Sequence, residues 1–188
     1  MAVTGPAAVK PGKGKAKGSA FERQVCKDLS LWITKGEKDD CLWRSAMSGG
    51  RATISKAKGK GLAHVAGDIC ATHPAGHRLI DLFFVECKAY ADLKLAQLMT
   101  SNKGLVVDFL QQARKQADQN GKLLLLVLKQ NKLPTMLGLS LCGVNKLSPT
   151  VYGCRPLAIL PTLDLTLFDY RTFLAQVAYL PIQRRKLA

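Results

Sequence analysis

The feature of the sequence that most constrains the fold is the run "LLLLVLK", residues 123–129, which is apolar up to its last residue. It has the length of a β-strand, and an apolar strand without alternation is expected where both faces of a sheet are covered. The preceding segment, residues 104–122, spaces apolar residues at helical intervals and ends near Asn120-Gly121, a typical helix terminus. A buried strand reached through a helix indicates a crossover connection. These segments predict an α/β protein.

The N-terminal part predicts one helix followed by three strands. Ser19 and Glu22 have the spacing of a capping box, so we expect the helix to begin at Ser19. The expected strands are residues 41–47, 64–72 and 78–90, with a mobile basic loop at 48–61 and a turn at 74–77. We expect an antiparallel meander in which residues 78–90 form the central strand.

The C-terminal third predicts two short strands, at residues 135–142 and 156–161, and a last helix over 169–180 capped by Asp169. We expect one domain over residues 18–188, with a core at about 18–130 and a C-terminal extension at 131–188. Residues 1–17 are rich in Lys, Gly, Ala and Pro. They predict a flexible basic arm that either contacts phosphates or only aids solubility.

The charge is strongly unbalanced, with 28 Lys and Arg against 13 Asp and Glu, a net charge of +15. This balance favours a polyanionic partner, most simply nucleic acid. No segment is long and apolar enough to span a membrane, so we expect no membrane partner. A ribosomal or packaging protein would carry the same charge, so charge alone does not indicate an enzyme.

The cysteines and histidines do not suggest a zinc site. None of the six cysteines is arranged as CxxC, and we expect small buried thiols in a reducing compartment. His73 and His77 flank a proline and a glycine, which predicts a turn and argues against a ligand-bearing helix.

Two charged residues interrupt the apolar strand "LFFVECKAY". Glu86 and Lys88 are two positions apart, so in a strand they share a face. The simplest interpretation is an ion pair on a solvated face. However, Asp68 lies on the preceding expected strand and can come close to Glu86. Two close carboxylates repel each other, and a divalent cation relieves the repulsion. The pattern therefore also fits a metal-dependent site with Lys88 beside it.

The order of these residues resembles the PD-(D/E)xK nucleases, and most of all the archaeal-type and phage Holliday junction resolvases. The resemblance covers roughly residues 18–130 and rests on "GSAFER" with Glu22 and Arg23, "RSAMSGG" with Arg44 and Ser48, "GDI" with Asp68, and "VECK" with Glu86 and Lys88. Asp68 follows glycine where the named pattern has proline, and the loop after Ser48 is longer than in compact resolvases. The resemblance implies a restriction-endonuclease-like fold, a mixed β-sheet flanked by helices.

The resemblance also implies roles for these residues. Asp68, Glu86 and the backbone carbonyl of Cys87 would bind Mg²⁺, for which Mn²⁺ can substitute. Lys88 would assist the attacking water, and Glu22 would join the site from the helix. Structural alternatives remain open, because Glu22 also fits a capping box and Asp68 also fits a turn cap. The residues that we expect at DNA phosphates are Arg23, Arg44, Ser48, Arg51, Lys56, Lys58 and Lys60.

The resemblance implies an Mg²⁺-dependent endonuclease that cuts four-way DNA junctions as a homodimer in the cytoplasm, near a nucleoid or in a phage-infected host. A symmetric dimer would match the twofold symmetry of the junction. The apolar segment 156–168 either forms that dimer interface or packs on the core. The alternatives are a restriction- or repair-type nuclease acting on other DNA and a non-catalytic nucleic-acid-binding protein. A pure binder gains nothing from carboxylates near its phosphate surface.

Overall fold

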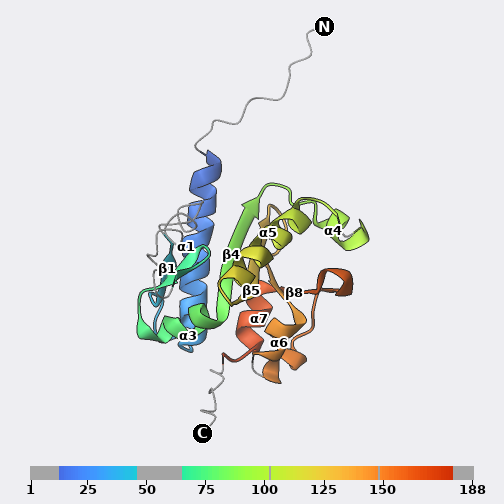
Figure 1. The fold of residues 1–188 in the computed structure, drawn as a ribbon. Coiled ribbons are helices and arrows are strands. Elements are labelled where there is room, and N and C mark those ends of the chain that lie inside the picture. Colours follow the sequence, from blue (N-terminus) through green and yellow to red (C-terminus); the bar gives the residue numbers. More distant parts are fainter. Residues whose placement is uncertain (1–12, 46–64, 102, 148, 180–188) are drawn as a thin grey trace.

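The computed structural model describes residues 13–45, 65–101, 103–147 and 149–179. Its helices are α1 (Lys13–Ile33), α3 (Pro74–Leu82), α4 (Leu95–Ser101), α5 (Leu105–Gln119), α6 (Leu141–Asn145) and α7 (Tyr170–Gln176), with 3₁₀ turns η1 (Pro149–Gly153) and η2 (Pro161–Leu163). Its strands are β1 (Leu42–Arg44), β2 (Val65–Ala66), β3 (Ile69–Ala71), β4 (Phe83–Tyr90), β5 (Leu123–Gln130), β6 (Met136–Leu139), β7 (Ala158–Leu160) and β8 (Leu165–Asp169). Strand β4 runs between α1 and α5 (Figure 1).

The main sheet has five strands in the order β4-β5-β6-β8-β7. Strands β4 and β5 are parallel, and the pairs beyond them are antiparallel. The predicted α/β class with a mixed, helix-flanked sheet is therefore confirmed. Because β6, β8 and β7 continue the sheet that β4 and β5 begin, the C-terminal third shares one hydrophobic core with the rest.

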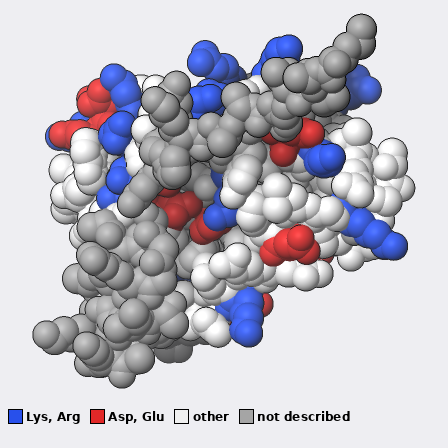
Figure 2. All heavy atoms as spheres, turned by 90° about the horizontal axis from the view of Figure 1, so that it is seen from above, with Lys and Arg blue, Asp and Glu red and all other residues white. Residues whose placement is uncertain are grey.

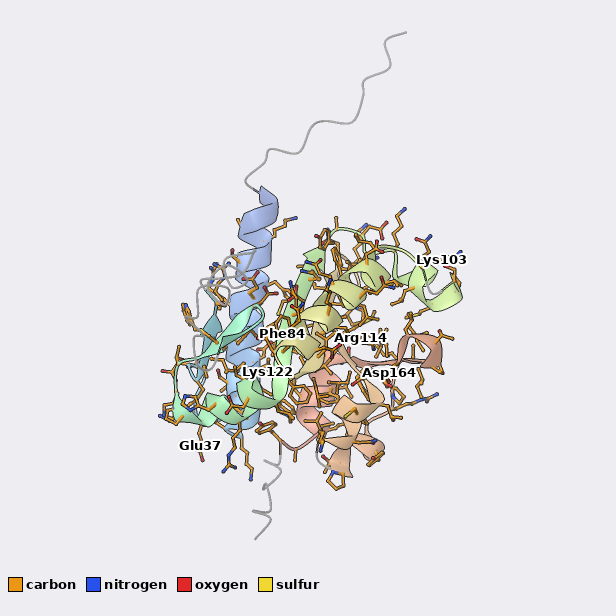
Figure 3. The ribbon with its side chains drawn as sticks, viewed as in Figure 1. Glu37, Phe84, Lys103, Arg114, Lys122 and Asp164 are labelled. Atoms are coloured by element: carbon orange, nitrogen blue, oxygen red, sulfur yellow. The ribbon has the colours of Figure 1, made fainter. Side chains whose placement is uncertain are left out.

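Helix α5 makes the crossover from β4 to β5, as the sequence predicts. Its buried residues include Leu110, Ala113 and Ala117, and residues 124–128 of β5 are buried. The helix ends at Gln119 and is capped by Asn120, and Gly121 follows with φ +63°. Helix α5 is also joined to the turn before β8. Its Arg114 side chain donates a hydrogen bond to the backbone oxygen of Asp164 at 2.5 Å (Figure 3).

The predicted three-stranded meander is wrong. Strands β1, β3 and β2 form a separate small antiparallel sheet, and β4 is an edge strand of the main sheet instead of its centre. A parallel bridge between Gly67 and Val85 joins the two sheets. Strand β4 pairs along its length with β5, which leaves its other edge to receive the tip of the β2–β3 hairpin.

Residues 74–82 form helix α3, so the predicted turn at 74–77 and the predicted strand start at 78 are both wrong. The His73 Nδ1 atom accepts a hydrogen bond from the Ala75 amide at 3.1 Å, and Pro74 stands at the first helical position, where proline is favoured. Leu79 and Ile80 are buried. A short apolar segment fits a buried helix as well as a strand. Here the cap formed by His73 and the proline at position 74 favour the helix.

Helix α1 begins at Lys13, before the predicted start at Ser19. Ser19 is therefore inside the helix, and the capping-box interpretation of Glu22 is wrong. Residues 13–17, which we expected to belong to a flexible arm, are helical. The rest of that arm, residues 1–12, lies outside the described residues.

The C-terminal segment is partly as predicted. Strands β6 and β7 fall within the expected ranges, and the Asp169 carboxylate accepts a hydrogen bond from the Thr172 amide at 2.8 Å at the start of α7. Helix α7 ends at Gln176, earlier than expected. Strand β8 was not predicted. It buries Leu165, Leu167 and Phe168 within the chain's own core, so this part of segment 156–168 packs on the core.

The six cysteines are all free. Cys26, Cys41, Cys87 and Cys154 are buried, as expected, but Cys70 is half-buried and Cys142 is exposed. Within the described ranges, no helix has the length and apolar character needed to cross a membrane.

Candidate active site

Strand β4 presents Glu86 and Lys88 on one face, as its alternation predicts. In the parallel register, Glu86 lies opposite Leu126 of β5, and Lys88 lies opposite Leu128. The Lys88 Nζ atom is 2.5 Å from the Glu86 Oε1 atom, and their side chains are only 23% and 11% exposed. The pair is therefore largely buried, which argues against an ordinary ion pair on a solvated face.

A tight hairpin turn brings Asp68 to the edge of β4. Gly67 and Asp68 form the tip between β2 and β3, and Gly67 has φ +74°. The Asp68 amide donates to the Val85 oxygen at 2.9 Å, and the Cys87 amide donates to the Asp68 Oδ2 atom at 2.8 Å. Asp68 is thus in a turn and not in the predicted strand, and two hydrogen bonds fix it beside Glu86.

The two carboxylates lie close enough to interact. Burial, and after it the charge of Glu86, raises the pKa of the Asp68 carboxyl to about 7. The hydrogen bond from the Cys87 amide and the positive charge of Lys88 offset these effects only in part. Ionising both carboxylates is therefore costly in the protein alone, and a divalent cation would remove that cost.

The aromatic ring of Phe109 supports Lys88 from helix α5. The Lys88 Nζ atom is 5.1 Å from the centre of the Phe109 ring, within the range of a cation–π interaction. The Tyr90 ring lies 5.3 Å from that of Phe109. Burial alone would lower the pKa of Lys88, but Glu86 outweighs it, so the pKa is raised and the ammonium group stays charged. The contact between Phe109 and Lys88 was not predicted from the sequence.

Glu22 reaches the same neighbourhood from α1. Its Oε2 atom is 2.5 Å from the Arg44 Nε atom, and the Glu22 and Arg44 side chains are 14% and 29% exposed. The amide of Ser45, the residue that follows β1, donates to the backbone oxygen of Asp68 at 2.7 Å. The structure therefore brings Glu22, Arg44 and Asp68 together, although they are far apart in the sequence.

The donor set fits a hard divalent cation held by few protein ligands. Among the residues that the structure describes, no three His, Cys, Asp or Glu side chains are grouped to hold a metal. Burial raises the pKa of the Cys87 thiol well above its usual value, so this side chain is not a thiolate ligand. Two close carboxylates and a backbone carbonyl are hard oxygen ligands, and Mg²⁺ commonly keeps several waters beside one or two carboxylates.

The expected phosphate-binding residues are only partly described. Arg23 is exposed on α1, next to Glu22, and Arg44 is half-buried in its ion pair. Ser48, Arg51, Lys56, Lys58 and Lys60 lie outside the described residues. Figure 2 looks onto the end of the molecule where β4 finishes. Acidic and basic side chains lie side by side near the middle of this face, and further Lys and Arg lie at its rim.

Comparison with known proteins identifies a family for this chain. The model of the family described as "Phage putative PDDEXK endonuclease" matches residues 13–152, which is well over half of the chain and includes Glu22, Asp68, Glu86 and Lys88. No curated protein and no solved structure matches the chain. The chain therefore belongs to this phage PD-(D/E)xK endonuclease family: it is a nuclease with a restriction-endonuclease-like fold.

Proposed function

We propose that the protein is a Mg²⁺-dependent DNA endonuclease whose catalytic residues are Asp68, Glu86, Lys88 and Glu22. The observation that carries this proposal is the buried contact of Asp68 with the Cys87 amide beside the Glu86–Lys88 pair. A protein that only binds DNA would gain nothing from burying two mutually repelling carboxylates next to a phosphate surface.

Each residue has a role in phosphodiester hydrolysis. Asp68, Glu86 and the Cys87 carbonyl would hold the metal, which when bound activates water and stabilises charge on the phosphate. Lys88 is held between Glu86 and the Phe109 ring, where its ammonium group can orient the attacking water or stabilise the developing charge. Glu22 would join from α1 through a metal-bound water. By resemblance, the attack is in line and leaves a 5′-phosphate and a 3′-hydroxyl.

The preferred substrate that we propose is a four-way DNA junction, cut by a homodimer in the cytoplasm of a phage-infected host. Two opposed cuts resolve such a junction, and a twofold dimer supplies two sites at a fixed separation. Because β8 packs inside the chain, the interface would use other apolar groups. Among the described residues after 131, the large exposed apolar side chains are Leu133, Leu141, Tyr152, Leu157 and Ile159.

Cleavage of matched four-way, Y-shaped and linear DNA tests the substrate. We expect four-way junctions to outcompete linear duplex of equal length, and light scattering to give about twice the chain mass of 20.4 kDa. A monomer that cuts branched and linear DNA alike would favour a restriction- or repair-type nuclease. We also propose that a single nuclease domain follows the N-terminal basic residues and includes the C-terminal strands.

Mg²⁺ should stabilise the protein more at pH 8 than at pH 5. The pKa of Asp68 in the metal-free fold, about 7, exceeds its ordinary value of 3.8. The stability that this carboxyl contributes is therefore present below about pH 4 and is lost as the pH rises through about 7. A cation that binds the ionised form reverses the loss. Melting temperatures measured with Mg²⁺ and with EDTA at both pH values check this.

The Asp68→Asn variant is the control for this measurement, because it keeps a side-chain oxygen for the Cys87 amide but cannot ionise. Its melting temperature should respond little to Mg²⁺ at either pH. Equal Mg²⁺ responses in the wild-type protein at both pH values, or a full response in Asp68→Asn, would contradict a metal site at Asp68.

Replacing Phe109 by Leu should lower kcat and leave KM nearly unchanged. The ring contributes a cation–π contact of about 0.5–2 kcal/mol to holding Lys88, which corresponds to a loss of about 2- to 30-fold in rate. Phe109→Tyr keeps the aromatic ring and should restore most of the activity. Steady-state kinetics of both variants check this, and equal activity of Leu and Tyr at position 109 would show that the ring does not position Lys88.

A further inference from the structure

The ion pair between Glu22 and Arg44 engages two groups that DNA cleavage would need elsewhere. Glu22 would be needed at the metal, and Arg44 would be needed at a DNA phosphate. In this structure the Nε atom of Arg44 bonds directly to the Oε2 atom of Glu22 at 2.5 Å. While this contact holds, the Nε edge of the guanidinium is unavailable to phosphate, and the Glu22 Oε2 atom is engaged by Arg44. Metal binding by Glu22 and phosphate binding by Arg44 therefore each compete with the Glu22–Arg44 ion pair.

The backbones that carry Glu22 and Arg44 are held in place, so only their side chains can move to new partners. Strand β1 is fixed at Arg44 by its pairing with Ile69 of β3 and by the bond from the Ser45 amide to the Asp68 oxygen. Glu22 projects from the middle of α1, a long helix packed on β1 and β4. The charge of Glu22 also contributes to raising the pKa of Asp68, so Glu22 lies within electrostatic reach of the metal-binding carboxylates without a change of backbone.

We propose that Arg44 is a positioning residue that couples the binding of a DNA phosphate to the release of Glu22 toward the metal. This inference rests on the proposed function. A DNA phosphate offers the guanidinium a second charged acceptor, and Arg44 then leaves Glu22 free to bind the cation or one of its waters. The enzyme without DNA is therefore a weaker metal binder than the enzyme with DNA, and its site is completed only on substrate.

Such coupling must be reciprocal in binding. If phosphate tightens Mg²⁺ binding by a given factor, Mg²⁺ tightens phosphate binding by the same factor. We expect a factor of about 5 to 30, in the range usual for coupled sites. The coupling must vanish when either partner of the ion pair is removed, because a single contact carries it.

Isothermal titration of Mg²⁺ into the whole protein tests this without any cleavage step. The probe for phosphate is thymidine 5′-monophosphate, which has no diester bond to cut. In the wild-type protein, the nucleotide should tighten Mg²⁺ binding about 5- to 30-fold. The Arg44→Gln variant should bind Mg²⁺ tightly without the nucleotide and gain little from it. Glu22→Gln, alone or combined with Arg44→Gln, should bind weakly and show no coupling.

A matched charge control separates release of Glu22 from a general loss of positive charge. Lys129 carries its Nζ atom 5.6 Å from the ring centre of Phe21, the residue before Glu22, and Lys129→Gln removes one positive charge there while leaving the ion pair intact. It should behave as wild type. If Lys129→Gln tightens Mg²⁺ binding as much as Arg44→Gln does, or if Arg44→Gln retains the full coupling, the inference is overturned.

The Asp68→Asn variant distinguishes failure of this inference from failure of the proposed function. If wild-type Mg²⁺ binding depends on Asp68 but Arg44→Gln changes neither affinity nor coupling, only the role of Arg44 is wrong. If Asp68→Asn binds Mg²⁺ as the wild-type protein does, the metal site itself is wrong and the inference falls with it. Circular dichroism of each variant confirms that the comparison is between folded proteins.

Discussion

Replacing Asp68 by Asn, or Glu86 by Gln, is expected to abolish DNA cleavage while keeping or tightening DNA binding. Each change removes a proposed ligand of the catalytic cation, and such a cation stabilises a transition state by several kcal/mol. We therefore expect the rate to fall by at least about a thousand-fold. Each change also removes a negative charge that faces the DNA phosphates, so affinity should not fall. Single-turnover cleavage and gel-shift titrations measure the two effects separately.

Asp118→Asn and Glu37→Gln are matched controls for these two substitutions. Both residues are exposed, and Asp118 lies on α5 whereas Glu37 follows α1. The two control variants each remove one carboxylate charge by the same chemical change, but away from the cluster. Both variants should cut DNA at the wild-type rate. A variant at Asp68 or Glu86 that cuts DNA nearly as fast as these controls would show that the site is elsewhere.

Replacing Gly67 by Ala should both destabilise the protein and inactivate it. A Cβ atom at this position would lie 2.2 Å from the backbone oxygen of Val85, which receives the Asp68 amide. The clash is with backbone and Gly67 has φ +74°, so the hairpin tip must move off β4. We expect the free energy of unfolding to fall by roughly 2–4 kcal/mol and cleavage to fall by at least about a hundred-fold, because Asp68 moves with the tip.

Gly121→Ala is the control for the backbone conformation. Gly121 also has a positive φ, +63°, but no atom lies within 4 Å of its would-be Cβ. It should lose only about 1 kcal/mol of stability and keep its catalytic rate. Denaturant unfolding and cleavage kinetics of the two variants make the comparison. If Gly67→Ala cuts DNA as well as Gly121→Ala does, the contact between the hairpin tip and β4 does not position Asp68.

The pairing of Glu86 with Lys88 could be predicted from the sequence because both residues lie on the same strand. Glu86 and Lys88 share a strand, so their common face follows from alternation, and the buried run of β5 with the preceding helix correctly predicted the parallel crossover. The helix of residues 74–82 could not be separated from a strand by its apolar residues. Its start depends on the cap formed by His73 and on Pro74, and we interpreted those residues as a turn.

The contacts that complete the site depend on tertiary packing and have no local signal. Nothing in the sequence around Glu22 indicates that it pairs with Arg44 of another element. The Phe109 ring contacts Lys88 only because α5 covers the face of β4 that carries it. The position of Asp68 was predicted near Glu86 for an incorrect reason. A hairpin tip docked on an edge strand brings it there, and not a neighbouring strand of a meander.

We propose that the cluster of Asp68, Glu86 and Lys88 makes this chain a metal-dependent endonuclease. Cleavage of an end-labelled four-way junction by the wild-type protein and by Asp68→Asn, each with Mg²⁺ and with EDTA, tests it most directly. We predict that only the wild-type protein with Mg²⁺ cuts the DNA, and that its products carry 5′-phosphate and 3′-hydroxyl ends. Cleavage in EDTA, or equal cleavage by Asp68→Asn, would contradict the claim.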